Sequence, residues 1–267
     1  MKKLRIILPV LIALVLLTVL ATVLSVSFAK EEEKSATVPF EVVETTEYVS
    51  KPKKPKFEDL TGDFLHISTE LENTFNANFV KRLTTHFNQV YPILAERWNY
   101  GIMYDVNYDM GELEGAAAYQ MGTSNPLVMQ ICLIEGHFKA NPGDVHTLTH
   151  ELTHALQVYK DSKYGASNNA NGGSWITEGI ADVSRYNYDP GFVLYNYASN
   201  QKYTDSYRIT ARFFIWIEDN VQETFVEQFH EALKCEPYSA KFFVRITGYT
   251  VDELWQMYAE SDHKIKS

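Results

Sequence analysis

The chain has 267 residues, of which 45% are hydrophobic and 13% aromatic, enough for one sizeable globular domain but not for two. Its formal net charge of −10 argues against nucleic acid as a partner, because nucleic-acid binding needs an excess of basic residues. The two cysteines, Cys132 and Cys235, are too few for a disulfide scaffold and leave their pairing open.

The N-terminus has the pattern of an export segment. A basic start (MKKLR) precedes an almost wholly apolar run over residues 6–28, and small residues suit a cleavage site after Ala29. The run is also long enough to span a bilayer. Residues 1–29 are therefore predicted to be a signal peptide or an N-terminal membrane anchor. Either alternative places the rest of the chain outside the cytoplasm, secreted or tethered to the membrane.

Residues 30–56 are charged and contain three prolines, which predicts an extended, solvated linker. The domain proper is expected over residues 57–267. Its first predicted element is a helix over residues 76–98, where apolar side chains recur at helical spacing and Pro92 is a reason for a kink or break.

Three strands are expected next in the chain. They are predicted over residues 102–109, 116–121 and 127–134 from their alternating or continuous apolar character. Cys132 lies inside the last of these runs and is interpreted as a small core residue.

A second amphipathic helix is predicted from Val145 to about Tyr159, with Asp144 as its N-cap after an Asn-Pro-Gly turn. It contains the pattern H-E-x-x-H. On a helix, His150 and His154 lie on one face about 40° apart, near the spacing that two imidazoles need to bind one metal ion. Glu151 projects toward the same side, where it can take a proton from a metal-bound water. This is the arrangement of a zinc metalloprotease.

A catalytic zinc ion usually takes three protein ligands and keeps a fourth position for water, so a third ligand is expected on a later element. Residues 161–174 are rich in Ser, Asn and Gly, which predicts a loop. A further helix, capped by Ser174, is predicted over residues 175–182. Glu178 and Asp182 share one face of it. Their spacing suits a ligating carboxylate and a carboxylate that hydrogen-bonds the outer nitrogen of a ligating histidine.

The remainder of the chain is predicted to be mainly helical, over residues 207–219, 222–233 and 251–261, the last helix capped by Thr250. The expected fold class is therefore α+β. A mixed sheet comes first, the active-site helix follows, and a mainly helical C-terminal part completes the domain.

Three other histidines are further candidates for the site. His146 precedes His150 by four residues, but three histidines over about 12 Å of helix axis do not fit one ion, so His146 is interpreted as a polar first-turn residue. His137 and His230 are interpreted as surface or satisfied core histidines. A role next to the site or toward an oxyanion is the alternative for both.

Several blocks together resemble the basic secretory protein family, proposed zinc peptidases of plants and bacteria, and the similarity extends over roughly residues 57–260. The blocks are HELTHALQ (150–157), WITEGIAD (175–182) with Arg185, YRITARFFIW (207–216), Phe225-Val226 and FFVRITGYTVDELWQMY (242–258). The resemblance implies that His150, His154 and Glu178 are zinc ligands and that Glu151 is the general base. The acidic charge departs from the family name and argues against polyanionic partners.

The resemblance, and the order of H-E-x-x-H helix, loop and E-x-x-x-D helix, also imply a zincin-like fold similar to the gluzincins. In zincins the sheet precedes the metal-binding helix and its edge strand pairs with extended substrate, so residues 116–121 are the candidate edge strand. Metalloproteases need a donor besides zinc to stabilise the oxyanion. Tyr207 lies in a matching block and is the candidate, with simple packing as the alternative.

The function expected from the sequence is hydrolysis of peptide or protein substrates by a secreted or surface-tethered peptidase with one catalytic Zn²⁺. A non-catalytic, zinc-containing extracellular binding domain is the alternative. The presence of Glu151 argues against it, because a structural zinc site has no use for that carboxylate. A third interpretation keeps the enzyme but changes its substrate, for example to a cell-wall peptide.

Overall fold

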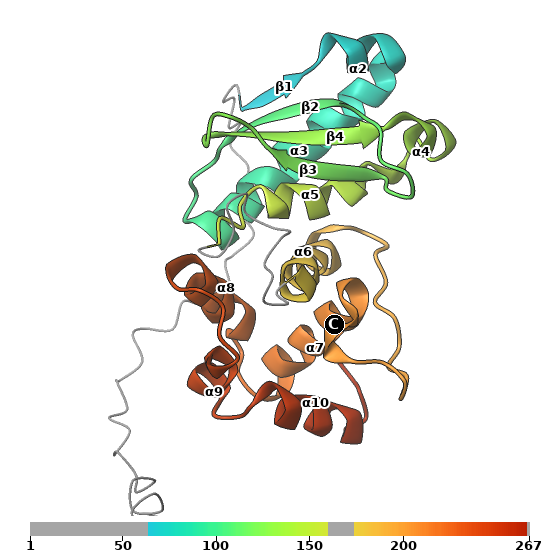
Figure 1. Cartoon of the computed structure of the whole chain (residues 1–267). Coiled ribbons are helices and arrows are strands. Elements are labelled where there is room, and N and C mark those ends of the chain that lie inside the picture. The colour runs from blue at the N-terminus through green and yellow to red at the C-terminus, as the bar shows by residue number, and fades with distance from the viewer. Residues whose placement is uncertain (1–63, 160–173, 266–267) are drawn as a thin grey trace, which may run out of the picture. The chain divides into compact units, whose positions relative to one another are not determined.

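A computed structural model describes residues 64–159 and 174–265, all of which belong to one compact unit within Pro52–Ser267 (Figure 1). The predicted signal or anchor segment (1–29), the linker (30–56) and most of the predicted loop 161–174 lie outside the described residues. Within the described ranges, no helix is both long and apolar enough to cross a bilayer. The unit is α+β, with a small mixed sheet and many helices, as the sequence predicts.

The sheet has four strands in the order β1-β2-β4-β3. They are β1 (Leu65–Ile67), β2 (Asp105–Gly111), β3 (Ala118–Gly122) and β4 (Val128–Ile134). The first three in that order are parallel, and β3 is antiparallel to β4. Among the residues that the structure describes, β3 therefore has one unpaired side, and the prediction of an edge strand in this stretch is confirmed. Strand β1 was not predicted, because three residues are too few to show an alternating pattern.

Helix α3 (Ala77–Asn99) begins as predicted, with the Asn76 side chain accepting a hydrogen bond from the Phe79 backbone N–H at 3.0 Å. Pro92 was a reason to expect a kink or a break, and the break does not occur, since one helix continues through Pro92. Proline removes one backbone hydrogen bond, but the neighbouring Tyr91 and Leu94 are completely buried. Their packing offsets the loss. The short helix α2 (Thr69–Thr74) precedes α3.

The H-E-x-x-H segment is less regular than predicted. A 3₁₀ turn (Asp144–Thr147) precedes the short helix α5 (Leu148–His154), where one helix to about Tyr159 was expected. Asp144 is not an N-cap, because its carboxylate pairs with His137 of α4 (Glu135–Ala140) at 2.8 Å. After His154 the backbone bonds shift to three-residue spacing, as in Gln157 N–H to the His154 carbonyl, which ends the α-helix.

The C-terminal part consists of helices, with a 3₁₀ turn (Tyr203–Asp205) before α7. The helices are α6 (Ser174–Tyr188), α7 (Tyr207–Asn220), α8 (Phe225–Cys235), α9 (Lys241–Thr247) and α10 (Val251–Glu260). The predicted cap of α10 is confirmed, since Thr250 and Glu253 form a capping box. Helices α6 and α7 approach closely at Gly179, where a Cβ atom would lie 2.4 Å from the Thr210 side chain.

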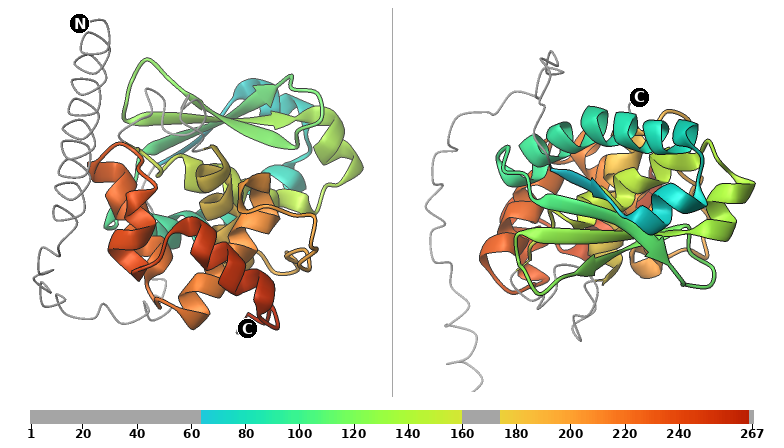
Figure 2. Two further views of the ribbon diagram at one scale, coloured as in Figure 1. Left: turned by 60° about the horizontal axis from the view of Figure 1, so that its bottom comes forward. Right: turned by 90° about the horizontal axis from the view of Figure 1, so that it is seen from above.

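The layers place α5 at the centre of the unit. Helices α3 and α5 lie against one face of the sheet, and α5 is sandwiched between the sheet and α6 (Figures 1 and 2). Phe87 of α3 packs edge-on against Tyr108 of β2, with ring centroids 6.1 Å apart. Cys132 is buried and Cys235 exposed, and both are free thiols. Residues on α5 can therefore meet residues of α6 on one side and of β3 on the other.

Candidate metal centre

The two motif histidines lie side by side on α5. His150 and His154 are each 7% exposed, and their ring centroids are 4.5 Å apart with nearly perpendicular planes. Two residues four positions apart on a helix are neighbours on one face, so the local sequence alone produces this pairing.

The third group comes from α6. A Glu178 carboxylate oxygen lies 2.9 Å from His150 Nε2 and 3.5 Å from His154 Nε2. One side-chain atom from each of these three residues lies within 4.8 Å of the others. A tetrahedral zinc ion with bonds of 2.0–2.2 Å holds its ligands about 3.4 Å apart. Two imidazole nitrogens and one carboxylate oxygen at this spacing fit zinc by both geometry and chemistry.

The outer nitrogens of both imidazoles are held by other side chains. His150 Nδ1 lies 2.9 Å from an Asp182 carboxylate oxygen, and Asp182 is only 3% exposed. His154 Nδ1 lies 2.7 Å from the Gln157 amide oxygen. The amide nitrogen of Gln157 in turn donates to the Thr177 carbonyl at 3.0 Å. With Nδ1–H donating in both cases, each Nε2 faces Glu178. The hydrogen bond between His150 Nε2 and Glu178 places a proton on that nitrogen, and a metal ion would take the place of this proton.

The sequence pattern does not predict a role for Gln157. The only available signal was its position three residues after His154, within the stretch HELTHALQ. That spacing is local, but the partner that orients the Gln157 amide is the backbone of α6, twenty residues further along the chain.

At this centre, the histidines and the carboxylates shift the pKa values of one another. Burial disfavours a charged imidazole, yet hydrogen bonds to Asp182 and Glu178 raise the pKa of His150 to about 10. Burial also disfavours the charged form of Glu178, but its hydrogen bonds with the two histidines hold its pKa well below the usual range. The carboxylates therefore create a field that favours a positive charge between them, which a divalent cation satisfies.

Glu151 lies between α5 and the sheet. It is half-buried, and the backbone of Gln120 in β3 is among the groups that lower the pKa of its carboxylate. Burial raises its pKa, while the two motif histidines lower it. A raised carboxylate pKa is what a general base near neutral pH requires. Strand β3, at the edge of the sheet that the described residues form, also contacts α5 and so lies next to this centre.

Tyr207 reaches the same centre from the start of α7. Its ring stacks on the His150 ring, with centroids 5.9 Å apart and an interplanar angle of 21°. Burial and then the charges of Glu178 and Glu151 raise the pKa of its hydroxyl, which keeps it a hydrogen-bond donor. Ser206 and Tyr207 both have positive φ, at 69° and 46°. Such strain in two consecutive non-glycine residues is typical of functional sites.

The other histidines lie outside this group. His146 packs edge-on against His86 at 5.0 Å, and His137 is paired with Asp144. His230 is buried, 2.7 Å from the Trp98 carbonyl and 3.0 Å from the Tyr159 hydroxyl. The interpretation of His137 and His230 as surface or satisfied core residues is confirmed.

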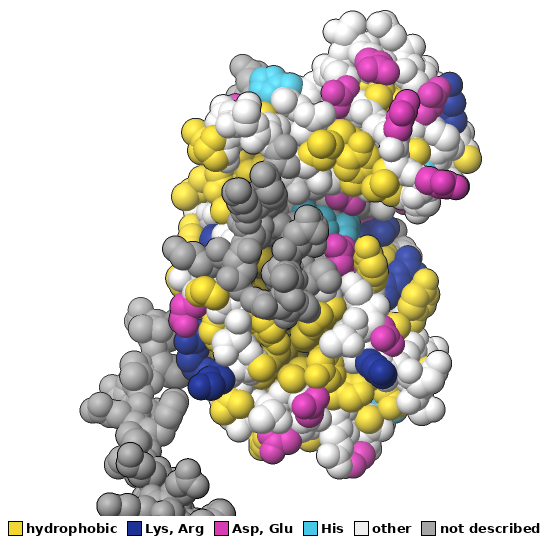
Figure 3. Space-filling view, in the orientation of Figure 1, with side chains coloured by type: hydrophobic (Ala, Val, Ile, Leu, Met, Phe, Trp, Pro, Cys, Tyr) yellow, Lys and Arg dark blue, Asp and Glu magenta, His cyan; other side chains and the backbone are white. Residues whose placement is uncertain are grey.

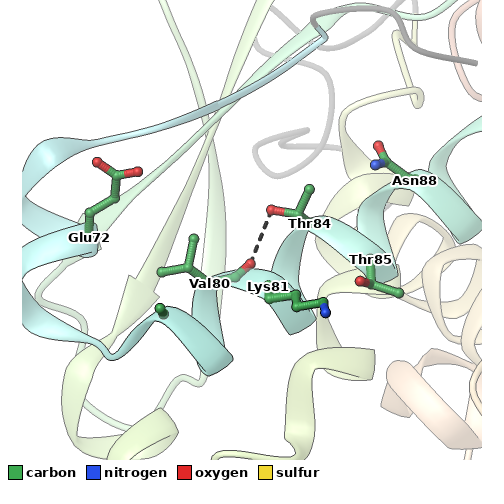
Figure 4. A pocket seen from close by; sticks show the side chains of 7 residues that line it. Glu72, Val80, Lys81, Thr84, Thr85 and Asn88 are labelled. Atoms are coloured by element: carbon green, nitrogen blue, oxygen red, sulfur yellow. Dashed lines mark hydrogen bonds between the residues drawn. The ribbon is translucent and has the colours of Figure 1, made fainter.

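In the space-filling view, histidine and acidic side chains lie in a hollow between the sheet and the helical part (Figure 3). A separate hollow lies along α2 and α3 (Figure 4). Its lining includes Glu72, Lys81, Thr84 and Asn88, and the Thr84 hydroxyl donates to the Val80 carbonyl at 3.1 Å. None of the three residues of the metal centre lines it.

Comparison with known proteins adds one match. A family model named BSP and described as "Peptidase of plants and bacteria" matches residues 73–258. This range contains every residue of the centre described above. Neither the search of curated proteins nor that of solved structures found a match.

Proposed function

The chain belongs to the BSP family of peptidases of plants and bacteria, and from this premise we propose that it is a zinc-dependent peptidase. His150, His154 and Glu178 are the proposed zinc ligands. The observation that carries the proposal is that these three side chains converge next to Glu151 and to the free edge of β3. Family membership supports peptidase activity in general, and the geometry supports the metal-dependent mechanism.

When bound, a zinc ion would polarise the scissile carbonyl and lower the pKa of the attacking water. The remaining steps belong to side chains. The Glu151 carboxylate takes a proton from the water as its oxygen attacks the carbonyl carbon. It then delivers that proton to the nitrogen of the leaving amine.

Tyr207 is the proposed donor to the oxyanion. Its ring lies against His150, its hydroxyl is protonated at neutral pH, and its side chain is 54% exposed toward solvent. A donor that is already in place when negative charge develops on the carbonyl oxygen lowers the barrier without reorganisation.

Strand β3 is the proposed docking edge for the substrate backbone. One side of β3 pairs with β4, β3 ends the strand order of the described sheet, and β3 contacts helix α5, which carries Glu151. An extended peptide that adds to this edge would bring its carbonyl groups past the general base. A peptide or protein is therefore the proposed substrate, and the enzyme is proposed to act outside the cytoplasm, either secreted or anchored by residues 6–28.

The experiment that tests the proposal compares the purified full-length protein with its Glu151→Gln variant on a peptide library, with zinc content measured in parallel. We expect about one zinc per chain in both proteins and cleavage by the wild type alone. If both proteins bind zinc and neither cleaves, the alternative of a non-catalytic zinc-containing binding domain is favoured. If neither binds metal, the proposed centre is wrong.

A further inference from the structure

A stack of arginines and aromatic rings begins on α6, about two helical turns after Glu178. Arg185 follows Asp182 by three residues on α6, so the two share a helix face. The Arg185 guanidinium lies 4.3 Å from the centre of the Phe192 ring. On the same ring, 4.4 Å from its centre, lies the guanidinium of Arg208, the residue after Tyr207. Basic and hydrophobic side chains are visible together at the rim of the histidine hollow (Figure 3).

The two arginines differ in how their charge is balanced. Arg185 binds the buried Asp189 carboxylate through two nitrogens, at 3.0 and 2.8 Å. Arg208 has no hydrogen bond or ion pair with any residue in the part of the chain that the structure describes, and its contacts are the rings of Phe192 and Tyr195. Arg185 is thus a structural cation, whereas Arg208 retains its donors.

Stacking determines what Arg208 can bind. Packing on rings uses the faces of a guanidinium and leaves its N–H donors, which lie in its plane, for another partner. The Arg208 side chain is only partly exposed, so the rings restrict its rotamers before any ligand arrives. Two donors in one plane match the two oxygens of a carboxylate.

The acidic groups of the metal centre give a fixed cation at Arg208 a role in binding an anionic substrate group. Even with a divalent cation bound, the three carboxylates of Glu151, Glu178 and Asp182 outnumber its two charges, in a chain whose net charge is −10. A substrate carboxylate near the scissile bond would need a local positive charge to offset the resulting repulsion. Tyr195, which is 57% exposed, extends the ring surface next to Arg208 toward solvent.

We propose that Arg208 is a specificity-determining residue that binds a carboxylate of the substrate through its guanidinium, while Phe192 and Tyr195 hold it in place. The carboxylate comes from an Asp or Glu side chain close to the scissile bond or from the C-terminus of a short peptide. This inference rests on the proposed peptidase function and names the substrate class it favours.

The test uses matched peptides that differ by one charge. Asp is exchanged for Asn and Glu for Gln at each position around the cleaved bond, and in a second set the C-terminal carboxylate is exchanged for an amide. The first set detects a side-chain carboxylate and the second a terminal one. We expect the wild type to prefer the charged member of one set by about tenfold or more in kcat/KM.

Arg208→Gln should abolish that preference, and Arg208→Lys should keep only part of it, because an ammonium retains the charge but not the planar pair of donors. Arg245→Gln is the matched control. It removes the same charge from an exposed arginine of α9 that pairs with Glu236, and it should leave the preference intact.

A wild type that cleaves both members of every pair equally would overturn the inference. So would an Arg208→Gln variant that loses the same factor on charged and amide peptides, since that is the signature of a purely structural stack. Binding of the same peptides to Glu151→Gln, with and without Arg208→Gln, separates this inference from the proposed function. Charge-dependent binding that needs Arg208, without cleavage by the wild type, would reject the peptidase and keep the carboxylate site.

Discussion

The Gln157 amide oxygen accepts a hydrogen bond from His154 Nδ1 at 2.7 Å, and its amide nitrogen donates a second one to the Thr177 carbonyl on α6. The amide therefore links the helix that carries two of the proposed ligands to the helix that carries the third. Because Gln157 is completely buried, neither of its polar atoms has water as an alternative partner.

This link leads to the first prediction. Gln157→Leu removes the group that orients His154 and leaves the Thr177 carbonyl without its donor, so we expect zinc affinity to fall by about 10- to 100-fold. Competition with a chromophoric chelator measures it. Gln256→Leu is the control, since that exposed glutamine on α10 donates its hydrogen bond to the exposed Glu260, away from the centre. Unchanged zinc affinity in Gln157→Leu would mean that the imidazole needs no such support.

Tyr207→Phe tests the proposed oxyanion donor. The ring that stacks on His150 is kept and only the hydroxyl is lost, so we expect kcat to fall by about 10²- to 10³-fold, with little change in zinc content. Steady-state kinetics on one cleaved peptide is the measurement. Tyr249→Phe, at an exposed tyrosine outside the centre, is the control. If Tyr207→Phe retains wild-type kcat, the tyrosine only packs against the histidine.

Gly179 sets how closely α6 can approach α7. In Gly179→Ala the new Cβ atom would meet Thr210 at 2.4 Å, so one helix must move, at a cost of about 1–3 kcal/mol in the free energy of unfolding. Glu178 precedes this residue, and we expect zinc affinity to fall as well. Urea denaturation of the metal-free protein measures the first effect.

Gly136→Ala is the matched control for Gly179. It places the same methyl group on helix α4, where nothing lies within 4 Å of the new Cβ atom. We expect its stability to equal or slightly exceed that of the wild type, because alanine favours helix. Equal stability of the two variants would show that the close approach of α6 and α7 is not a constraint.

His230 predicts a pH dependence of stability. Burial lowers its pKa from 6.5 to about 3 in the folded protein. Below pH 6.5 the unfolded chain therefore binds a proton that the folded chain does not. The free energy of unfolding should fall by about 1.4 kcal/mol per pH unit from this group between pH 6.5 and 3.

Urea denaturation at pH 7, 6 and 5, on the wild type and on His230→Gln, isolates the effect, because every other titrating group is shared. Glutamine can still donate to the Trp98 carbonyl, so the variant is expected to fold. Its stability should decline less steeply with falling pH than that of the wild type. Parallel declines would show that His230 is protonated in both states.

Much of the fold follows from local pattern. Strands β2, β3 and β4 and helices α3, α7 and α10 all overlap their predicted ranges, because apolar periodicity reports which face of an element is buried. The edge position of β3 also agrees with the prediction. The errors have local causes as well: Pro92 suggested a break that tertiary packing overrides, and Asp144 suggested a cap although its carboxylate is engaged by His137.

The sequence alone predicted the three side chains that converge in the candidate centre. The spacing of His150 and His154, and that of Glu178 and Asp182, are properties of single helices, where neighbours on one face are known from the repeat of 3.6 residues. Only the tertiary structure decided how the two helices face each other, that Gln157 joins them, and that Arg208 lies without a carboxylate partner among the described residues. Those relationships connect residues far apart in the chain and depend on packing that no local repeat encodes.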